Sequence, residues 1–157
     1  MFKMKSIPIE AFQAFLVENS DYFTDYASRV PDFEEIRADF LEDVPPSHSL
    51  NQKSVRGVYN EGDLIAFIDC LDDFPEANER TIGYLVVTKK WRNRGIGRQI
   101  YQQIEAECVA SGYESLHLTV LSTNEAAIYF WERQGYVITD EVETEYGLQY
   151  WMKKVIV

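Results

Sequence analysis

Residues 81–98 read TIGYLVVTKKWRNRGIGR, an apolar run followed by a basic run that contains two glycines. The nearly all-apolar part, residues 81–87, is typical of a strand buried on both faces, so we expect it at the centre of a sheet. From Gly97 onward the apolar residues recur at helical spacing, with Ile100 and Ile104 four positions apart. The stretch therefore predicts a buried strand, a basic turn and a helix in direct succession.

The basic run from Arg92 to Arg98 has the features of a phosphate site. Five of the 15 Lys and Arg residues lie within positions 89–98. A helix start leaves about four backbone N–H groups without internal partners, and glycines there let an anion come close to them. The run is no P-loop, because no Gly-Lys-Ser/Thr follows, and no dinucleotide fingerprint, because a third glycine is missing. A solvated basic turn is the alternative, and the glycine spacing favours the phosphate site.

The rest of the chain predicts the other elements of one domain, residues 1–157. Strand, helix, strand and helix from residue 81 to residue 135 imply a single parallel crossover inside an otherwise antiparallel, mixed sheet. A capping box from Ser122 to Glu125 predicts the start of the last helix, and Gly112 and Gly135 are expected to cap the two helices at their ends. We also expect a short first strand, helices at 9–18 and 33–41, a hairpin of strands 55–59 and 64–70, a strand at 116–120 and closing strands at 136–142 and 147–156.

The composition restricts the class of protein. At 157 residues, with 46% of them apolar, the chain suits one domain with one core. A net charge of −11 argues against nucleic acid or an anionic membrane as the main partner and favours cationic partners. Because we find neither the apolar region of a signal peptide nor a run of about 18 apolar residues, we expect a soluble, cytoplasmic protein.

The cysteines and histidines give no sign of a metal site. Cys70 and Cys108 lie in apolar segments without CxxC spacing or a histidine cluster, so we expect inert buried thiols. His48 and His117 are far apart in the sequence, and we expect ordinary surface or strand histidines.

The basic run and a later segment match two motifs, which occur in this order in the second half of the chain. The first is Arg or Gln, two residues, Gly, one residue and Gly or Ala, and it is matched by Arg92, Gly95 and Gly97. The second is Asn, a small residue, an aromatic pair and Gly followed by an aromatic residue, and it is matched by Asn124, Ala127, Phe130, Trp131, Gly135 and Tyr136. With these two motifs, the sequence resembles the GNAT superfamily of acyl-CoA-dependent N-acetyltransferases, in detail from 82 to 136 and more loosely over nearly the whole chain.

The resemblance implies a fold and a reaction. The fold would be α/β (α+β), a mixed, mostly antiparallel sheet of about six to seven strands with about four flanking helices. The reaction would transfer the acetyl group of acetyl-CoA to a primary amine, in an enzyme for which a homodimer is an option. A non-catalytic acyl-CoA-binding regulatory module of the same fold is the alternative function.

The resemblance also implies where the cofactor binds. The backbone of Leu85, Val86 and Val87 would hold the pantetheine arm as an added strand does. Asn124 and Trp131 would flank the thioester end of this arm. Backbone amides of the basic run would hold the pyrophosphate, and the residues concerned are Arg92, Asn93, Arg94, Gly95, Ile96, Gly97 and Arg98.

The sequence departs from the family at two catalytic positions. Many relatives have a tyrosine where this chain has Trp131, whose indole N–H is not a usable acid near neutral pH. Relatives often have a glutamate on the central strand where this chain has Gly83. Asp69 is our first choice for the missing base, because an aspartate inside an apolar strand has to be hydrogen-bonded or functional, and a purely structural carboxylate is the alternative. Glu76 and Glu79 are weaker candidates that could take the proton through water.

Several residues are candidates for the acceptor side. Tyr22, Phe23 and Tyr26 follow the first helix and could line the acceptor cleft or pack in the core. Tyr129 lies about 200° round the helix from Trp131, so we expect it to point elsewhere. Small polyamines, amino sugars, amino acids and protein amines all remain open as acceptors. Acidic residues, which would attract a cationic amine or else lie in solvated loops, are Asp72, Asp73, Glu76, Glu79, Asp140, Glu141, Glu143 and Glu145.

Overall fold

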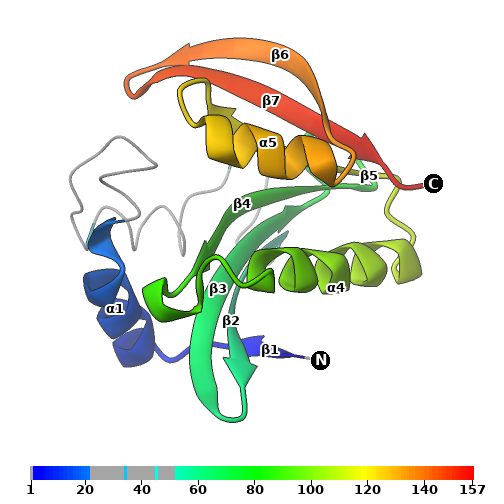
Figure 1. Cartoon of the computed structure of the whole chain (residues 1–157). Helices are drawn as coiled ribbons and strands as arrows, with labels where there is room; N and C mark the ends of the chain where they lie inside the picture. The colour runs from blue at the N-terminus through cyan, green and yellow to red at the C-terminus, as the bar shows by residue number, and fades with distance from the viewer. Residues whose placement is uncertain (1, 22–33, 35–44, 46–51) are drawn as a thin grey trace.

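The computed structural model describes residues 2–21, 34, 45 and 52–157, and within them seven strands form one sheet. The strand order is β1-β2-β3-β4-β5-β7-β6, with helices on both faces of the sheet (Figure 1). The helices that lie wholly within the described residues are α1 (Ile9–Glu18), α4 (Ile96–Ala110) and α5 (Glu125–Arg133), and a 3-10 turn spans Lys89–Trp91. The strands are β1 (Lys3–Ser6), β2 (Lys53–Asn60), β3 (Asp63–Asp72), β4 (Glu79–Val87), β5 (Ser115–Leu121), β6 (Val137–Thr144) and β7 (Gly147–Val155).

The sheet is mixed, as the sequence predicts. β4 and β5 run parallel, whereas every other neighbouring pair is antiparallel. Parallel neighbours need a long crossover connection, and α4 supplies it between β4 and β5. β4 is the fourth of the seven strands in the sheet, which confirms residues 81–87 as its centre.

Most of the other expected elements are confirmed to within two residues at their ends. The hairpin of β2 and β3, the strand β5 and the closing pair β6 and β7 all occur, as does the first helix. The expected helix at 33–41 lies outside the described residues. So do the acceptor-side candidates Tyr22, Phe23 and Tyr26.

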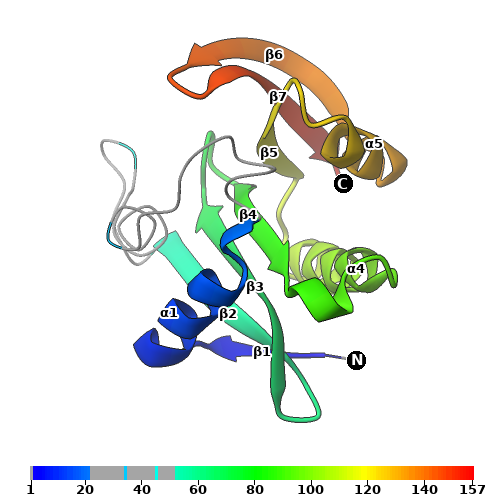
Figure 2. The ribbon, with the colours of Figure 1, turned by 60° about the vertical axis from the view of Figure 1, so that its left-hand side comes forward.

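Different helices cover the two faces of the sheet (Figure 2), and apolar side chains pack beneath them in two clusters. On one face Phe12 and Phe15 of α1 meet the ring of Phe67 edge to face, with centroids 5.3 and 5.4 Å apart. On the other face α4 buries Ile100 and Ile104 completely, and α5 packs beside it. Each helix thus buries one apolar stripe, and β4 is held from both sides.

The start of α5 differs from the expectation. The predicted capping box is wrong, because the N-cap of α5 is Asn124, whose side-chain oxygen accepts a hydrogen bond from the N–H of Ala127 at 3.2 Å. The backbone N–H of Ser122 instead donates to the carbonyl of Leu148 in β7 at 2.8 Å. Asparagine caps a helix as well as serine does, and its place two residues later lets α5 begin at Glu125.

The central strand is also less buried than expected. Gly83 is exposed, and Tyr84, Leu85 and Val87 are only half-buried. The reason is that β4 pairs with β5 only over Glu79–Thr81. Beyond this point none of the described strands pairs with this edge of β4, and the resulting opening is the site described next.

Candidate active site

A bulge interrupts β4 at Gly83. Asp69 of β3 pairs with Tyr84, and the next residue, Cys70, pairs with Ile82, so β4 has one residue more than β3 here. A bulge changes which face the following side chains point to and increases the local twist. Ile82 accordingly packs in the core under α4, whereas Tyr84 packs against the core under α1. The bulge therefore lies where β4 turns away from β5.

The diverging strands form two walls of a cavity of about 810 Å3. The last ladder pair between the strands joins Thr81 to His117. A strand edge without a neighbour presents backbone N–H and C=O groups, which an extended ligand can use as an added strand would. The strand residues that line the cavity are Ile82, Gly83, Tyr84, Leu85 and Val87 of β4 and Leu118, Thr119, Val120 and Leu121 of β5.

The start of α4 lies at the same cavity and suits an anion. Its N-cap is Gly95, which has a left-handed backbone (φ 75°) and no side chain with which to cap the helix. A Cβ atom added to Gly95 would meet nothing within 4 Å, so a ligand can approach the backbone there. Gly95 and the first residues of α4 line the cavity, so the unpaired N–H groups of this helix start lie at its wall, at the positive end of the helix dipole. Such a helix start is suited to a phosphate group, the ligand expected for the basic run.

The predicted cofactor residues mostly line this cavity. All of them do so except Val86 and Arg94. The side chain of Val86 is buried under α1, so only its backbone is left to serve a ligand. The guanidinium of Arg94 lies over the ring of Trp91, 5.5 Å from its centroid.

The side chain of Arg92 has a structural role that sequence reasoning missed. Its guanidinium donates to the carbonyl of Val87 at 2.8 Å, to Asp21 at 2.7 Å and to the side-chain oxygen of Asn19 at 3.2 Å. The same Asn19 oxygen accepts from the N–H of Lys89 at 2.9 Å. Arg92 thus ties the end of α1 to the turn after β4, which leaves its backbone for the anion site. The contact with α1 spans some 70 positions of sequence, so no local motif could reveal it.

Asn124 and Trp131 meet at the cavity from α5. The oxygen of Asn124 is used in capping, so the remaining hydrogen-bonding group of its side chain is the amide NH2, a donor. The ring of Trp131 stands edge to face against Tyr101 and Tyr136, with centroids 5.3 Å away in each case. Burial raises the pKa of both tyrosines, so neither hydroxyl is a ready proton source.

Asp69 and Gly83 form one structural feature. The Asp69 carboxylate is buried, with 6% of the residue exposed, and accepts a hydrogen bond from the N–H of Tyr84 at 2.6 Å. A Cβ atom added to Gly83 would lie 2.7 Å from Cγ of Asp69, far inside van der Waals contact. The carboxylate therefore fills the space in which a side chain at position 83 would begin.

Glu79 belongs to a buried charged cluster along the short stretch where β4 and β5 are paired. It accepts hydrogen bonds from the Ser115 hydroxyl, from Nε2 of His117 (3.1 Å) and from Nζ of Lys153 (3.2 Å). Burial alone would raise the pKa of Glu79, but the three donors outweigh it and lower that pKa to about 2. A carboxylate with so low a pKa is a poor base. Ser115 and Glu79 both meet the same ring nitrogen of His117, Nε2, which is not the geometry of a nucleophilic triad.

Because the cluster lowers the pKa of Glu79, the fold should lose stability as the pH falls. Because the pKa of Glu79 is about 2 in the folded state and ordinarily 4.5, its ionised form stabilises the fold above about pH 4.5. This contribution, at most roughly 3 kcal/mol, is lost as the pH falls toward 2. We expect Glu79→Gln to lower the free energy of unfolding at pH 7 and to flatten its loss between pH 5 and pH 2.

Urea unfolding monitored by circular dichroism at several pH values measures this effect. Glu76→Gln, a change in an exposed neighbour, should leave the acid dependence as in the parent. If the free energy of unfolding fell with pH equally steeply in the parent and in Glu79→Gln, the cluster would not hold the Glu79 carboxylate as described.

The acidic residues expected near the acceptor differ in their surroundings. Asp72 accepts from Arg80 at 2.7 Å, and Glu79 is held by its cluster, so neither is available to attract a cation. Asp140, Glu141 and Glu143 lie exposed on β6. No acidic residue in the described part of the chain lines the cavity.

Tyr129 corrects one expectation about α5. It does not point away from the site but lines the cavity together with Trp131, although 61% of it is exposed. Arg133 donates to its hydroxyl at 3.3 Å. The cavity is wide enough for residues on two sides of α5 to reach its rim. The angle of about 200° between Tyr129 and Trp131 on the helix therefore did not predict their positions relative to the cavity.

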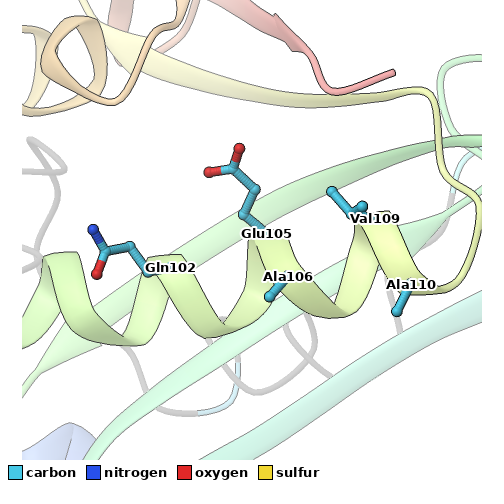
Figure 3. A pocket seen from close by; sticks show the side chains of 5 residues that line it. All are labelled: Gln102, Glu105, Ala106, Val109 and Ala110. Carbon is cyan, nitrogen blue, oxygen red and sulfur yellow. The ribbon is translucent and has the colours of Figure 1, made fainter.

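A second hollow, of about 420 Å3, runs along the outer side of α4 (Figure 3). All of its lining residues come from this one helix, and the only titratable one, Glu105, is paired with Lys154 at 2.8 Å. Within residues 2–21, 34, 45 and 52–157, no three His, Cys, Asp or Glu side chains are grouped so that they could hold a metal ion. In the same residues, no helix combines the length and the apolar character needed to cross a membrane.

An opened strand edge that leads to a helix start without a side-chain cap defines a class of site, one suited to an extended donor with a phosphorylated end. Residues 12–136 match the acetyltransferase (GNAT) family. The chain belongs to this family, and it is therefore an enzyme, an acetyltransferase of the kind that uses an acyl-CoA donor. None of the curated proteins matches the sequence.

Solved structures share the fold at low sequence identity. The ribosomal-protein-S18-alanine N-acetyltransferase of Escherichia coli has a TM-score of 0.71 and 18% identity, over 99% of this chain and 94% of that one. An acetyltransferase from Thermus thermophilus has a TM-score of 0.74 and 20% identity, over 99% and 97%. The PaiA N-acetyltransferase of Thermoplasma acidophilum, solved in complex with coenzyme A, has a TM-score of 0.67 and 18% identity, over 99% of both chains. At such identities the likeness establishes the fold, and the acceptor has to be inferred from the site.

Proposed function

We propose that this enzyme transfers the acetyl group of acetyl-CoA to a primary amine by direct attack in a ternary complex. The observation that carries the proposal is the cavity between β4 and β5, which joins an open strand edge to the uncapped start of α4. An acyl-CoA needs both parts, because its pantetheine arm is extended and has amide groups and its nucleotide end is a polyanion.

The residues at the two ends of the cavity fit this donor. The arm would lie along Leu85 and Val87, with peptide-like hydrogen bonds to the edge of β4. The diphosphate would bind the amides from Asn93 to Arg98, where Gly95 keeps the backbone accessible. A backbone N–H of β4 near the bulge would donate to the carbonyl oxygen as it gains negative charge during attack.

The acceptor has to reach the thioester as a free amine. A lysine-like amine has a pKa of about 10.4, so a base or a water chain must take its proton. We assign this role to Asp69, whose carboxylate is fixed beside Gly83 at the bulge. The amine nitrogen then bonds to the acetyl carbon, the carbon–sulfur bond breaks, and coenzyme A leaves as a thiolate that takes up a proton.

The acceptor is best described as a primary amine, either a small cationic amine or a protein amine. The net charge of −11 favours a positively charged partner over an anionic one. The exposed acidic residues of β6 could contribute to this field near the β7 side of the cavity. The cytoplasmic location and the single-domain organisation remain predictions, and a homodimer remains an option.

The proposal is tested by thiol release from acetyl-CoA in the presence of a panel of amines. The panel should contain polyamines, amino sugars, amino acids and peptides with lysine side chains or free amino termini. Amine-dependent release of coenzyme A, with the matching acetylated product in the mass spectrum, is the expected result. Tight binding of acetyl-CoA without release in any amine class would favour the non-catalytic binding module, which Trp131 and Gly83 motivate.

A further inference from the structure

The C-terminal end of α5 lies at the same cavity as the start of α4. Arg133 and Gln134 line the cavity there, next to Tyr129 and Phe130. Coenzyme A has a monoester phosphate on its ribose in addition to the diphosphate. Resting on the proposed function, we propose that Arg133 binds this second phosphate.

The position of Arg133 follows from contacts between the two helices. A Cβ atom added to Gly97, in the first turn of α4, would lie 3.9 Å from the ring of Phe130. Phe130 and Arg133 are three residues apart on α5, and Gln134 is four residues from Phe130, so all three lie on one side of the helix. Arg133 thus projects from the helix that borders the predicted diphosphate site, one turn further along.

The charge of Arg133 is not neutralised within the described residues. Three cationic side chains line the cavity, and they are Arg92, Arg98 and Arg133. Arg92 is bound to Asp21, and Arg98 lies in the first turn of α4 beside the predicted diphosphate site. Among the described residues, no carboxylate forms an ion pair with Arg133.

Arg133 is nevertheless held in place by neutral groups. Its guanidinium donates to the Tyr129 hydroxyl at 3.3 Å and lies 5.4 Å from the centroid of the same ring. A ring and a hydroxyl orient a guanidinium without cancelling its charge. An oriented, uncompensated arginine in a protein of net charge −11 suits a phosphate, which it can bind through two parallel N–H groups.

A purely structural role for Arg133 is the alternative. A basic residue in the last turn of a helix interacts favourably with the helix dipole, and α5 has Arg133 in that place. Such a role affects the stability of α5 but not the choice between ligands that differ in one phosphate. The two roles therefore separate in a binding experiment.

The experiment measures Kd by calorimetry for coenzyme A and for 3′-dephospho-coenzyme A. We expect the parent to bind coenzyme A about 10-fold to 100-fold more tightly than the dephosphorylated form. Arg133→Gln should lose this preference by weakening the binding of coenzyme A and leaving that of the dephosphorylated form unchanged. Lys90→Gln removes the same charge from an exposed residue that does not line the cavity, and it should behave like the parent.

Two results would overturn the inference while leaving the proposed function intact. One is equal affinity of the parent for the two ligands. The other is equal weakening of both ligands by Arg133→Gln, which would indicate a general effect on the site. Failure of the parent to bind either ligand would instead overturn the proposed function, and the role of Arg133 with it.

Discussion

Asp69→Asn should lower kcat by about 100-fold to 10,000-fold, the usual contribution of a general base. Asparagine keeps a side-chain oxygen that can accept from the N–H of Tyr84, so the fold around the bulge should remain. The amide cannot take a proton from the amine, whereas the binding of acetyl-CoA does not depend on it. We therefore expect kcat to fall while Kd for acetyl-CoA, measured by calorimetry, stays within about threefold of the parent value.

The space shared by Asp69 and Gly83 allows a sharper version of this test. Gly83→Glu alone should impair the enzyme, because its Cβ atom would collide with the Asp69 carboxylate. The double variant Asp69→Gly with Gly83→Glu moves the carboxylate from β3 to β4 and should recover part of the lost kcat. Asp63→Asn, the same change at an exposed position of β3, is the matched control. If Asp69→Asn kept the parent kcat, Asp69 would be a structural carboxylate only.

Gly95→Asp should weaken the binding of coenzyme A by about 100-fold or more, because several charge-assisted hydrogen bonds are lost together. The new carboxylate would stand at the N-cap of α4, where it is itself an acceptor for the first-turn N–H groups. It would compete with the diphosphate for these groups and repel it. Calorimetric titration with coenzyme A measures the change.

A matched control separates this effect from backbone strain. Gly112, just past the end of α4, also has a left-handed backbone (φ 83°, against 75° at Gly95) and open space around its missing side chain. Gly112→Asp should therefore cost similar stability but leave the affinity for coenzyme A unchanged. Equal affinities of both variants and the parent would mean that the diphosphate binds elsewhere.

Local patterns in the sequence were sufficient for most of the fold. The apolar run of β4, the helical spacing in α4 and the turn glycines each depend on neighbouring residues, so periodicity predicts them. The helix start without a side-chain cap, where we propose the anion site, could be predicted for the same reason, since Gly95 and the start of α4 are adjacent in the chain. The family motifs extended this local information to α5 and its position at the site.

The features that sequence reasoning missed depend on contacts between distant segments. The registers of β3, β4 and β5 decide that Asp69 fills the place of a side chain at position 83, and that His117 meets Glu79. The only sequence signal for the first contact was the pair itself, an aspartate in an apolar strand and a glycine where relatives have glutamate. No such signal marked Arg92 as the link to α1, because a basic residue in a predicted phosphate turn already had an expected role.

Amide hydrogen exchange, followed by NMR with and without acetyl-CoA, tests most directly whether the donor lies between β4 and β5. We predict that acetyl-CoA slows exchange at amides of Leu85 and Val87 and at those of Ile96, Gly97 and Arg98. Residues on the outer side of α4, such as Gln102 and Val109, should change little. This placement of the donor would be contradicted if saturating acetyl-CoA did not slow exchange at β4 and the first turn of α4. It would also be contradicted if exchange slowed only in other parts of the chain.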